Sequence, residues 1–251
     1  MTVPFAENEN VRIHYEVEGQ GPPLVLQHGF GSDMRTWEFY GYVKALAGDY
    51  QVIRIDARGH GESDKPHEPE AYELSRRAGD VVAVLDALGI ERAHYCGYSM
   101  GGWIGFGLVQ YFPQRLLSLA AGGVHPYPDE RFVAFDGVDG TDGNAFITAL
   151  ETLIGERFPR EARARLLAND LIALTAATQA RSAPVEALLK IQVPVLFYCG
   201  QRDIRLPEVQ QCAEQVPGAK LAVIPGTNHV TTFLRSDLVL PHLKEHLASA
   251  K

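Results

Sequence analysis

Short apolar runs alternate along the chain with longer stretches in which apolar residues recur every three or four positions. The short runs have the length of strands and lie at residues 11–17, 24–27, 51–55, 93–97, 117–121, 195–199 and 221–224. Most of them are mainly apolar rather than alternating, which is typical of parallel strands that helices cover on both faces. Residues 11–17 alternate polar and apolar side chains instead, and this pattern predicts an antiparallel strand at an edge of the sheet.

The longer stretches have the periodicity of amphipathic helices. They lie at residues 36–47, 72–88, 100–112, 207–215 and 236–247. Gly89 and Pro113 directly follow two of these stretches, and glycine and proline commonly end a helix. The alternation of strands and helices predicts an α/β fold, with a mostly parallel central sheet and helices on both of its faces.

The alternation stops after residue 122, and no strand-like run occurs again before residue 191. A tract rich in glycine and aspartate, residues 136–143, is typical of an exposed loop. Helical periodicity follows at residues 145–154 and 160–177. The predicted parts are a core domain of residues 1–122 and 191–251 and a short helical lid insertion of residues 123–190.

Four apolar side chains of this insertion are candidates for contact with a substrate: Phe132, Phe135, Phe146 and Ile147. A lid that closes over a cavity turns apolar side chains toward the ligand. The same side chains are equally suited to form the insertion's own core, and the sequence leaves both possibilities open.

Composition and charge narrow the classes of protein. With 46% hydrophobic and 22% charged residues the chain has enough apolar side chains for a packed core, which excludes a disordered protein. The net charge of -8 argues against nucleic acid as a partner. No leader-like N-terminus and no apolar run of about 18 residues occurs, so we expect no export and no membrane partner. Three cysteines are too few for a disulfide framework, which favours buried thiols and a cytoplasmic location.

The strongest chemical signal is the pentapeptide Gly97-Tyr98-Ser99-Met100-Gly101. It lies between a predicted strand and a predicted helix, and a sharp turn at this point holds a serine in a strained, exposed conformation. Such a turn needs small residues two positions before and after the serine, and both are glycine here. Ser99 is therefore a candidate nucleophile.

A serine hydroxyl needs a base to take its proton and usually an acid to orient that base. Asp203 follows the predicted strand at residues 195–199, and His229 follows the one at residues 221–224. The carboxyl ends of parallel strands meet at one edge of a sheet, where ligands bind in doubly wound folds. We therefore expect Asp203 and His229 to lie near Ser99.

Together these motifs resemble the α/β-hydrolase fold superfamily, in its small, lidded branch of serine esterases. The resemblance covers nearly the whole chain outside the insertion. It rests on His28-Gly29-Phe30-Gly31, Asp56-Ala57-Arg58-Gly59-His60-Gly61-Glu62-Ser63-Asp64, Gly97 to Gly101, Gly200-Gln201-Arg202-Asp203 and Asn228-His229. One residue departs from the family's pattern, since Asn228 stands where glycine often precedes the catalytic histidine.

The resemblance implies a role for each of these residues. Ser99 would be the nucleophile, His229 the general base and acid, and Asp203 the carboxylate that orients the histidine. The backbone N–H groups of Phe30 and Met100 would form the oxyanion hole. Neither a metal nor an organic cofactor is required.

The function that the resemblance implies is hydrolysis of a small carboxylic ester through an acyl-enzyme. Lactone, thioester and carbon–carbon bond hydrolysis use the same three residues and stay open as alternatives. A serine at position 99 argues against the haloalkane dehalogenase and epoxide hydrolase branches, which use aspartate there. Two other classes remain, a receptor for a small signalling molecule and an oxygenase without cofactor.

Three further histidine and loop signals have simpler interpretations. His242 and His246 have the spacing of a zinc-binding helix pair, but the stretch fits the end of an amphipathic helix and no third ligand is evident. By the resemblance, His28 and His60 shape loops around the site. Residues 56–64 lack the lysine of a phosphate-binding loop, so we expect Asp56 and Arg58 to brace this loop.

Overall fold

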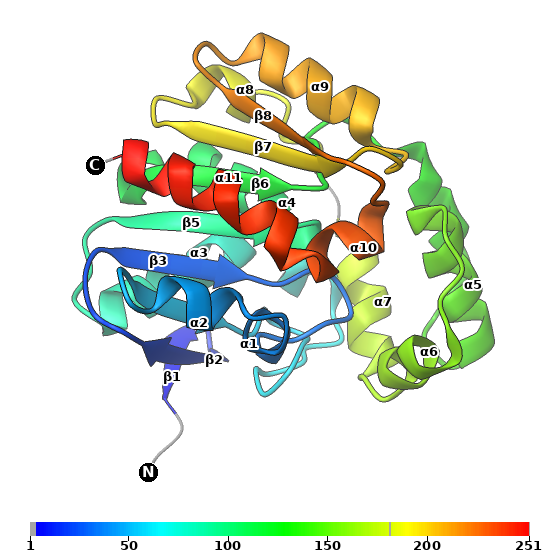
Figure 1. Cartoon of the computed structure of the whole chain (residues 1–251). Helices are drawn as coiled ribbons and strands as arrows, with labels where there is room; N and C mark the ends of the chain where they lie inside the picture. Colours follow the sequence, from blue (N-terminus) through cyan, green and yellow to red (C-terminus); the bar gives the residue numbers. More distant parts are fainter. Residues whose placement is uncertain (1–3, 181, 251) are drawn as a thin grey trace.

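The centre of the molecule is an eight-stranded sheet, seen in a computed structural model that describes residues 4–180 and 182–250 (Figure 1). The strands are β1 (Phe5–Asn8), β2 (Val11–Glu18), β3 (Pro23–Gln27), β4 (Gln51–Ile55), β5 (Ala93–Tyr98), β6 (Leu116–Gly122), β7 (Val195–Gly200) and β8 (Lys220–Ile224). Their order across the sheet is β1-β2-β4-β3-β5-β6-β7-β8. The pairings of β2 with β1 and β4 are antiparallel and all others are parallel, so the predicted mostly parallel sheet is confirmed.

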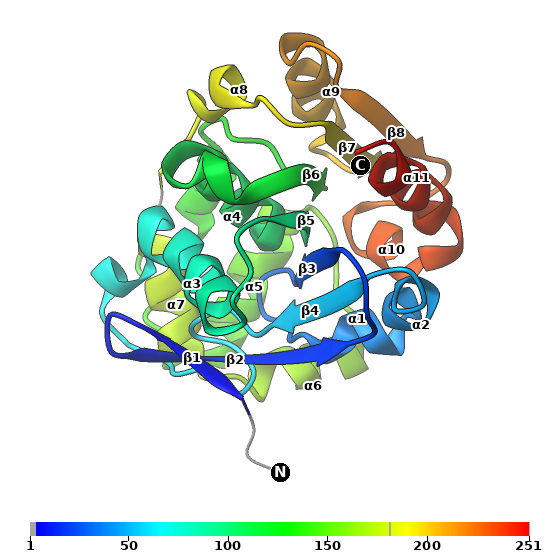
Figure 2. The same cartoon turned by 90° about the vertical axis from the view of Figure 1, so that its left-hand side faces the viewer.

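The antiparallel end of the sheet differs from the prediction. The strand predicted at residues 11–17 is antiparallel but does not form the edge, because β1 pairs with its outer side (Figure 2). The two strands are joined by Glu9 and Asn10, whose φ angles of 52° and 63° form a tight hairpin turn. β1 has only four residues and buries one of them, Ala6, so its apolar pattern is too short to reveal it.

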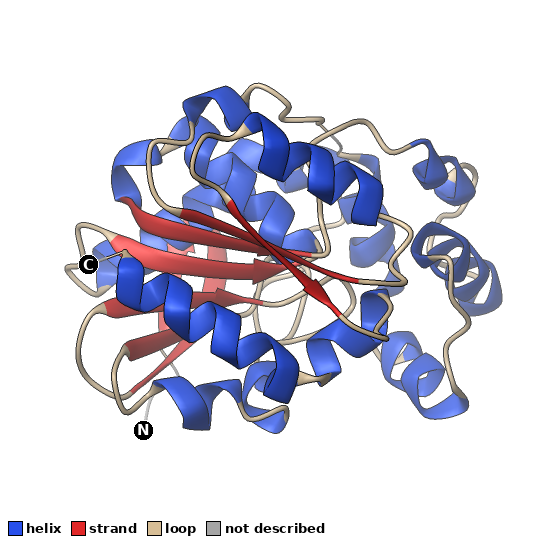
Figure 3. Cartoon of the chain, turned by 45° about the horizontal axis from the view of Figure 1, so that its top comes forward, coloured by secondary structure: helices blue, strands red, loops and turns tan. Residues whose placement is uncertain are grey.

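Helices cover both faces of the sheet, as predicted (Figure 3). One face carries α3 (Leu74–Ala87), α4 (Met100–Tyr111) and α9 (Leu206–Gln215), and the other carries α1 (Arg35–Phe39), α2 (Tyr42–Leu46) and α11 (Ser236–Ser249). Val81 and Ile104 pack into the first core, and Trp37 and Leu243 pack into the second. The sheet therefore has no solvated face along its central strands.

Two predicted helices are each split in two. Residues 36–47 form α1 and α2, which Gly41 separates with a left-handed φ of 81°. Residues 160–177 contain α6 (Arg160–Leu167) and α7 (Leu171–Gln179). Asp170 begins α7 by accepting a hydrogen bond from the Ala173 N–H at 3.0 Å, and a capping side chain of this kind starts a new helix.

The segment between β6 and β7 holds helices but no strand within residues 123–180 and 182–194. Its helices α5 (Gly143–Ile154), α6 and α7 lie beyond the carboxyl ends of the parallel strands (Figure 1). They share a small core of their own around Phe146 and Leu174. The short helix α8 (Ala187–Lys190) instead packs against α4 and α9. The division into a core domain and a lid insertion stays a prediction.

None of the helices in the described ranges is long and apolar enough to cross a membrane.

Candidate active site

Ser99 lies at the turn between β5 and α4. Its backbone has φ 51° and ψ -115°, a conformation that costs a residue other than glycine about 1–3 kcal/mol. The turn is tight, since a Cβ on Gly97 would lie 2.3 Å from the backbone of Gly101, and one on Gly101 would lie 2.2 Å from the Gln27 carbonyl oxygen. Glycine is therefore required at both positions to hold Ser99 at the carboxyl edge of the sheet.

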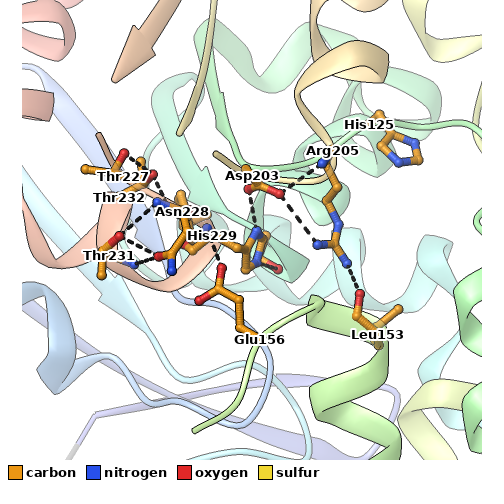
Figure 4. Close-up of polar contacts among 12 residues, drawn as sticks. His125, Leu153, Glu156, Asp203, Arg205, Thr227, Asn228, His229, Thr231 and Thr232 are labelled. Carbon is orange, nitrogen blue, oxygen red and sulfur yellow. Dashed lines mark hydrogen bonds and ion pairs between the residues drawn. The ribbon is translucent and has the colours of Figure 1, made fainter. Parts of the chain in front are cut away.

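Three predicted site residues come together at this edge. The Nε2 atom of His229 lies 3.1 Å from the Ser99 Oγ, and its Nδ1 atom lies 2.7 Å from Asp203 Oδ2. Asp203 follows β7, and His229 is the first residue of the helix α10 (His229–Leu234) after β8. Figure 4 shows the Asp203 carboxylate pointing at the imidazole of His229. The contact between Asp203 and His229 is buried, and the contact between His229 and Ser99 is partly buried at the cavity.

Burial and charge set the protonation of this group. Burial lowers the pKa of His229, its hydrogen bond to Asp203 opposes the shift, and the nearby Arg205 cation adds to it. The pKa of His229 therefore lies below its ordinary value. Burial raises the pKa of Asp203, but the hydrogen bond and charge of His229 outweigh it, so the net shift is downward. At neutral pH the imidazole is uncharged and able to accept a proton, beside an ionised carboxylate.

Asn228, the departure from the family's pattern, has a structural role. Its side-chain Oδ1 accepts a hydrogen bond from the Thr231 N–H at 2.8 Å, and the Thr231 hydroxyl accepts one from the Asn228 N–H at 2.9 Å. This reciprocal pair is a capping box, which begins α10 at His229. Asparagine therefore fixes the backbone of His229 through a helix cap.

The loop after β3 lies against the nucleophile. A Cβ on Gly29 would lie 3.5 Å from the Cβ of Ser99, and Phe30 and Met100 line the same cavity as Ser99. Met100 is the first residue of α4, where backbone N–H groups have no partner within the helix. The oxyanion hole formed by the N–H groups of Phe30 and Met100 stays a prediction.

Buried histidines hold this loop in place. His28 Nε2 accepts a hydrogen bond from the Ala57 N–H at 3.0 Å, and His60 Nε2 accepts one from the Gly31 N–H at 3.1 Å. Asp56 accepts from the Met34 N–H at 2.8 Å and the Glu62 N–H at 3.0 Å. These are the bracing positions that the sequence predicted for the two histidines and for residues 56–64.

A cavity of about 840 Å³ lies above Ser99 and His229, between the sheet edge and the helical segment. Of the four candidate substrate contacts, Phe132 lines this cavity. Phe135, Phe146 and Ile147 do not line it, and they pack together in the core of the helical segment. The helices of this segment pack against one another through their apolar faces, and these three side chains are buried in that contact.

The structure adds two residues that the sequence did not single out. Glu156, just after α5, accepts a hydrogen bond from the backbone N–H of His229 at 3.0 Å. Arg205 donates from Nη2 to the Leu153 carbonyl at 2.9 Å, and its own backbone N–H donates to Asp203 Oδ1 at 3.0 Å. The end of α5 therefore contacts the loops of both Asp203 and His229 (Figure 4). No local motif marks these contacts, because they join residues 52 to 73 positions apart.

Replacing Glu156 with alanine should lower kcat/KM for an ester about tenfold, because His229 loses the acceptor that holds its backbone. Glu156→Gln should recover most of the loss, since an amide oxygen also accepts from an N–H group. Steady-state kinetics of both variants check this, with Glu161→Ala on the exposed side of α6 as the matched control. Unchanged kinetics in Glu156→Ala would show that this contact does not position His229.

The other signals of the sequence do not converge on the site. His242 is exposed whereas His246 is buried, so the two side chains lie in different environments. Within the described ranges no group of three or more potential ligand side chains is arranged for a metal ion. The three cysteines are buried and free, and β6 separates the strands of Cys96 and Cys199.

Comparison with known proteins places this geometry in a family. A sequence model of the α/β hydrolase fold matches residues 22–137. The solved structure described as "Est816 as an N-Acyl homoserine lactone degrading enzyme" is 30% identical, with a TM-score of 0.76 over 96% of this chain and 99% of that one. The chain belongs to the α/β-hydrolase fold superfamily.

Two further similar proteins differ from each other in their described activities. An enol-lactonase from Burkholderia xenovorans LB400 has a TM-score of 0.83 over 98% of this chain and 100% of that one, at 23% identity, which shows the fold alone. A Bacillus subtilis (strain 168) protein named "Putative 2-succinyl-6-hydroxy-2,4-cyclohexadiene-1-carboxylate synthase" is 26% identical over 99% of both chains. The chain spans less than half the length of the next curated relatives that it matches. Membership supports hydrolytic activity without specifying the bond that is cleaved.

Proposed function

We propose that this α/β hydrolase is a serine esterase that cleaves small carboxylic esters through an acyl-enzyme. The observation that carries the proposal is the hydrogen-bonded series from Ser99 to His229 to Asp203 at the base of a cavity. The strained backbone of Ser99 supports it, since strain of this kind persists where a function needs it.

The geometry suggests how each step would proceed. Ser99 Oγ attacks the ester carbonyl carbon while its proton passes to His229 Nε2. Asp203 stays ionised and holds the imidazole in the orientation that receives this proton. The N–H groups of Phe30 and Met100 stabilise the oxyanion, each by about 3 kcal/mol of barrier. The alcohol leaves with the proton from His229, and water activated by the same imidazole then releases the acid.

A lactonase is the second candidate, since a lactone is a cyclic ester and the same residues would open it. The likeness to Est816, described as degrading an N-acyl homoserine lactone, favours this candidate over thioester and carbon–carbon bond hydrolysis. In both cases the substrate is a small molecule, and the proposed steps use no cofactor. A location in the cytoplasm stays a prediction of the cysteine content.

The test of the proposed function is a panel of esters, lactones and thioesters compared by kcat/KM on the purified protein. The proposal expects the highest values among esters. Higher values among lactones would favour the second candidate. Slow turnover on the whole panel together with a ligand-dependent rise in Tm would contradict both and favour a receptor.

Within the ester series we expect kcat/KM to peak between acetate and hexanoate. A fitting apolar groove would add about 0.8 kcal/mol for each buried methylene, but here charged side chains such as Asp129 and Arg205 interrupt the apolar wall. Nitrophenyl esters below their micellar concentrations give the measurement, and a maximum at decanoate or beyond would show a continuous channel along Leu153, Ile154 and Phe158.

A further inference from the structure

Two buried side chains in the cavity wall beside Asp203 carry nitrogen atoms without a hydrogen-bond partner among the described residues. They are Arg205, after β7, and His125, in the segment after β6. Each residue is only 6% exposed. Figure 4 shows His125 beside Arg205.

The Arg205 guanidinium forms two long ion pairs but no hydrogen bond with a carboxylate. Its Nη1 atom lies 3.8 Å from Asp203 Oδ1, and its Nη2 atom lies 3.9 Å from Asp129 Oδ2, both beyond hydrogen-bond distance. Each carboxylate already has closer donors, since Asp203 accepts from His229 at 2.7 Å and Asp129 accepts from Arg131 at 2.6 and 2.9 Å. The Nη1 group of Arg205 is therefore a buried donor that these residues leave unused.

The contacts of His125 identify its free nitrogen as a donor too. Its Nε2 atom faces the Nη2 of Arg131 at 3.5 Å, and a guanidinium can only donate. Nε2 is therefore the acceptor, which assigns the proton of the neutral imidazole to Nδ1. Nδ1 is the atom that has no partner.

The nearest alternative acceptor is the side chain of Glu208 on α9. Its charge acts on His125, and its Oε2 atom is also buried without a partner. Glu208 does not line the cavity, however, and no hydrogen bond joins it to His125 among the described contacts. The unused donors are therefore left to a group that enters from the cavity.

A second buried arginine gives the same cavity a positive character. Arg77 lines it and is 3% exposed. It donates to the Tyr72 carbonyl at 2.7 Å, to the Ala177 carbonyl at 2.7 Å and to the sulfur of Met100 at 3.3 Å. All three acceptors are neutral, and no ion pair joins Arg77 to a carboxylate within the described ranges. A buried charge without a counter-ion attracts an anion, despite the protein's net charge of -8.

We infer that the Arg205 and His125 side chains bind a carboxylate group of the substrate. A carboxylate accepts from both donors at once, and it would give the guanidinium the hydrogen bond that its two long ion pairs do not supply. The inference rests on the proposed function and narrows it, from small esters in general to esters or lactones that bear a carboxylate near the scissile bond.

The experiment compares matched substrates in a pH-stat at one pH. Monomethyl glutarate and monomethyl adipate are each paired with an isostere in which an isopropyl group replaces the carboxylate. A third pair, with the carboxylate on the alcohol part of an acetate ester, covers the opposite orientation. The measured quantity, for each pair, is kcat/KM for the carboxylate divided by kcat/KM for its isostere. A substitution that disturbs the reacting groups changes both values alike, so this effect cancels in the ratio.

The wild-type ratio should favour the carboxylate in at least one pair. Arg205→Gln should lower that ratio about tenfold to a hundredfold, which is the range for a charge-assisted hydrogen bond, and His125→Phe should lower it less. Arg205→Lys should retain part of it. Arg12→Gln, which changes an exposed arginine outside the cavity, is the control and should leave the ratio unchanged.

Failure of this inference differs from failure of the proposed function. If the neutral isosteres are cleaved as well as or better than the carboxylates by the wild-type protein, the inference is overturned while the esterase stands. If no ester of either kind is cleaved, the proposed function fails, and calorimetry with glutarate then decides the inference. Binding that Arg205→Gln weakens tenfold or more would support it, and no binding would overturn it.

Discussion

Replacing Ser99 with alanine should lower kcat/KM for a small ester by about 10⁴-fold to 10⁶-fold, the largest effect that we expect from any single substitution. The reason is that Ser99 Oγ, 3.1 Å from His229 Nε2, is the hydroxyl that hydrogen-bonds to this base within the described part of the chain. Without a nucleophile only the binding groups remain, and these account for a small part of the acceleration. Steady-state hydrolysis of nitrophenyl acetate by the purified variant gives the measurement.

Ser236→Ala is the matched control, because it makes the same chemical change at the start of α11, outside the cavity. It should retain wild-type kinetics. A Ser99→Ala protein that keeps more than a few per cent of the wild-type rate, with unchanged Tm, would show that Ser99 does not attack the substrate.

Replacing His229 with alanine should cost nearly as much, because the serine proton then has no acceptor. Asp203→Asn should cost less, about 10³-fold to 10⁴-fold, since the imidazole remains but loses the carboxylate that orients it. In the wild-type protein, kcat/KM should fall as the pH drops through the pKa of His229. Burial, opposed by Asp203 and reinforced by Arg205, lowers that pKa, so the midpoint of the fall should lie below the ordinary histidine value of about 6.5.

A pH series of kcat/KM between pH 4 and 9 tests the sign, because only the uncharged imidazole accepts the proton and the loss must occur on the acid side. A midpoint clearly above 6.5 would contradict the direction of the shift. Large losses in His28→Ala or His60→Ala, combined with an active His229→Ala, would mean that a different histidine is the base.

Much of the fold was predictable because its signals are local. The central strands are covered on both faces, so runs such as residues 195–199 are apolar throughout and stand out from the helices. The turn at Ser99 was equally visible, since the close approach of Gly97 to Gly101 admits no side chain and fixes both residues as glycine. Asp203 and His229 each follow a parallel strand, and such strands end at the same edge of the sheet. Their approach to Ser99 was therefore predictable as well.

What the sequence did not reveal depends on contacts between distant segments. β1 gains its partner from β2 and buries one side chain, too few for a pattern. Phe135 and Phe146 have the same apolar character as Phe132, and only the packing of the helices decides which of them faces the cavity. Arg205 resembles any arginine near a helix start until its neighbours show that it is buried beside Asp203.

The central claim is that Ser99 is the nucleophile of a serine hydrolase, and the most direct test is covalent labelling with a fluorophosphonate. Intact mass spectrometry of the treated wild-type protein should show one added phosphonyl group, and peptide mapping should place it on Ser99. The Ser99→Ala protein should remain unlabelled under the same conditions. Labelling that persists in Ser99→Ala, or a wild-type protein that takes up no group, would contradict the account.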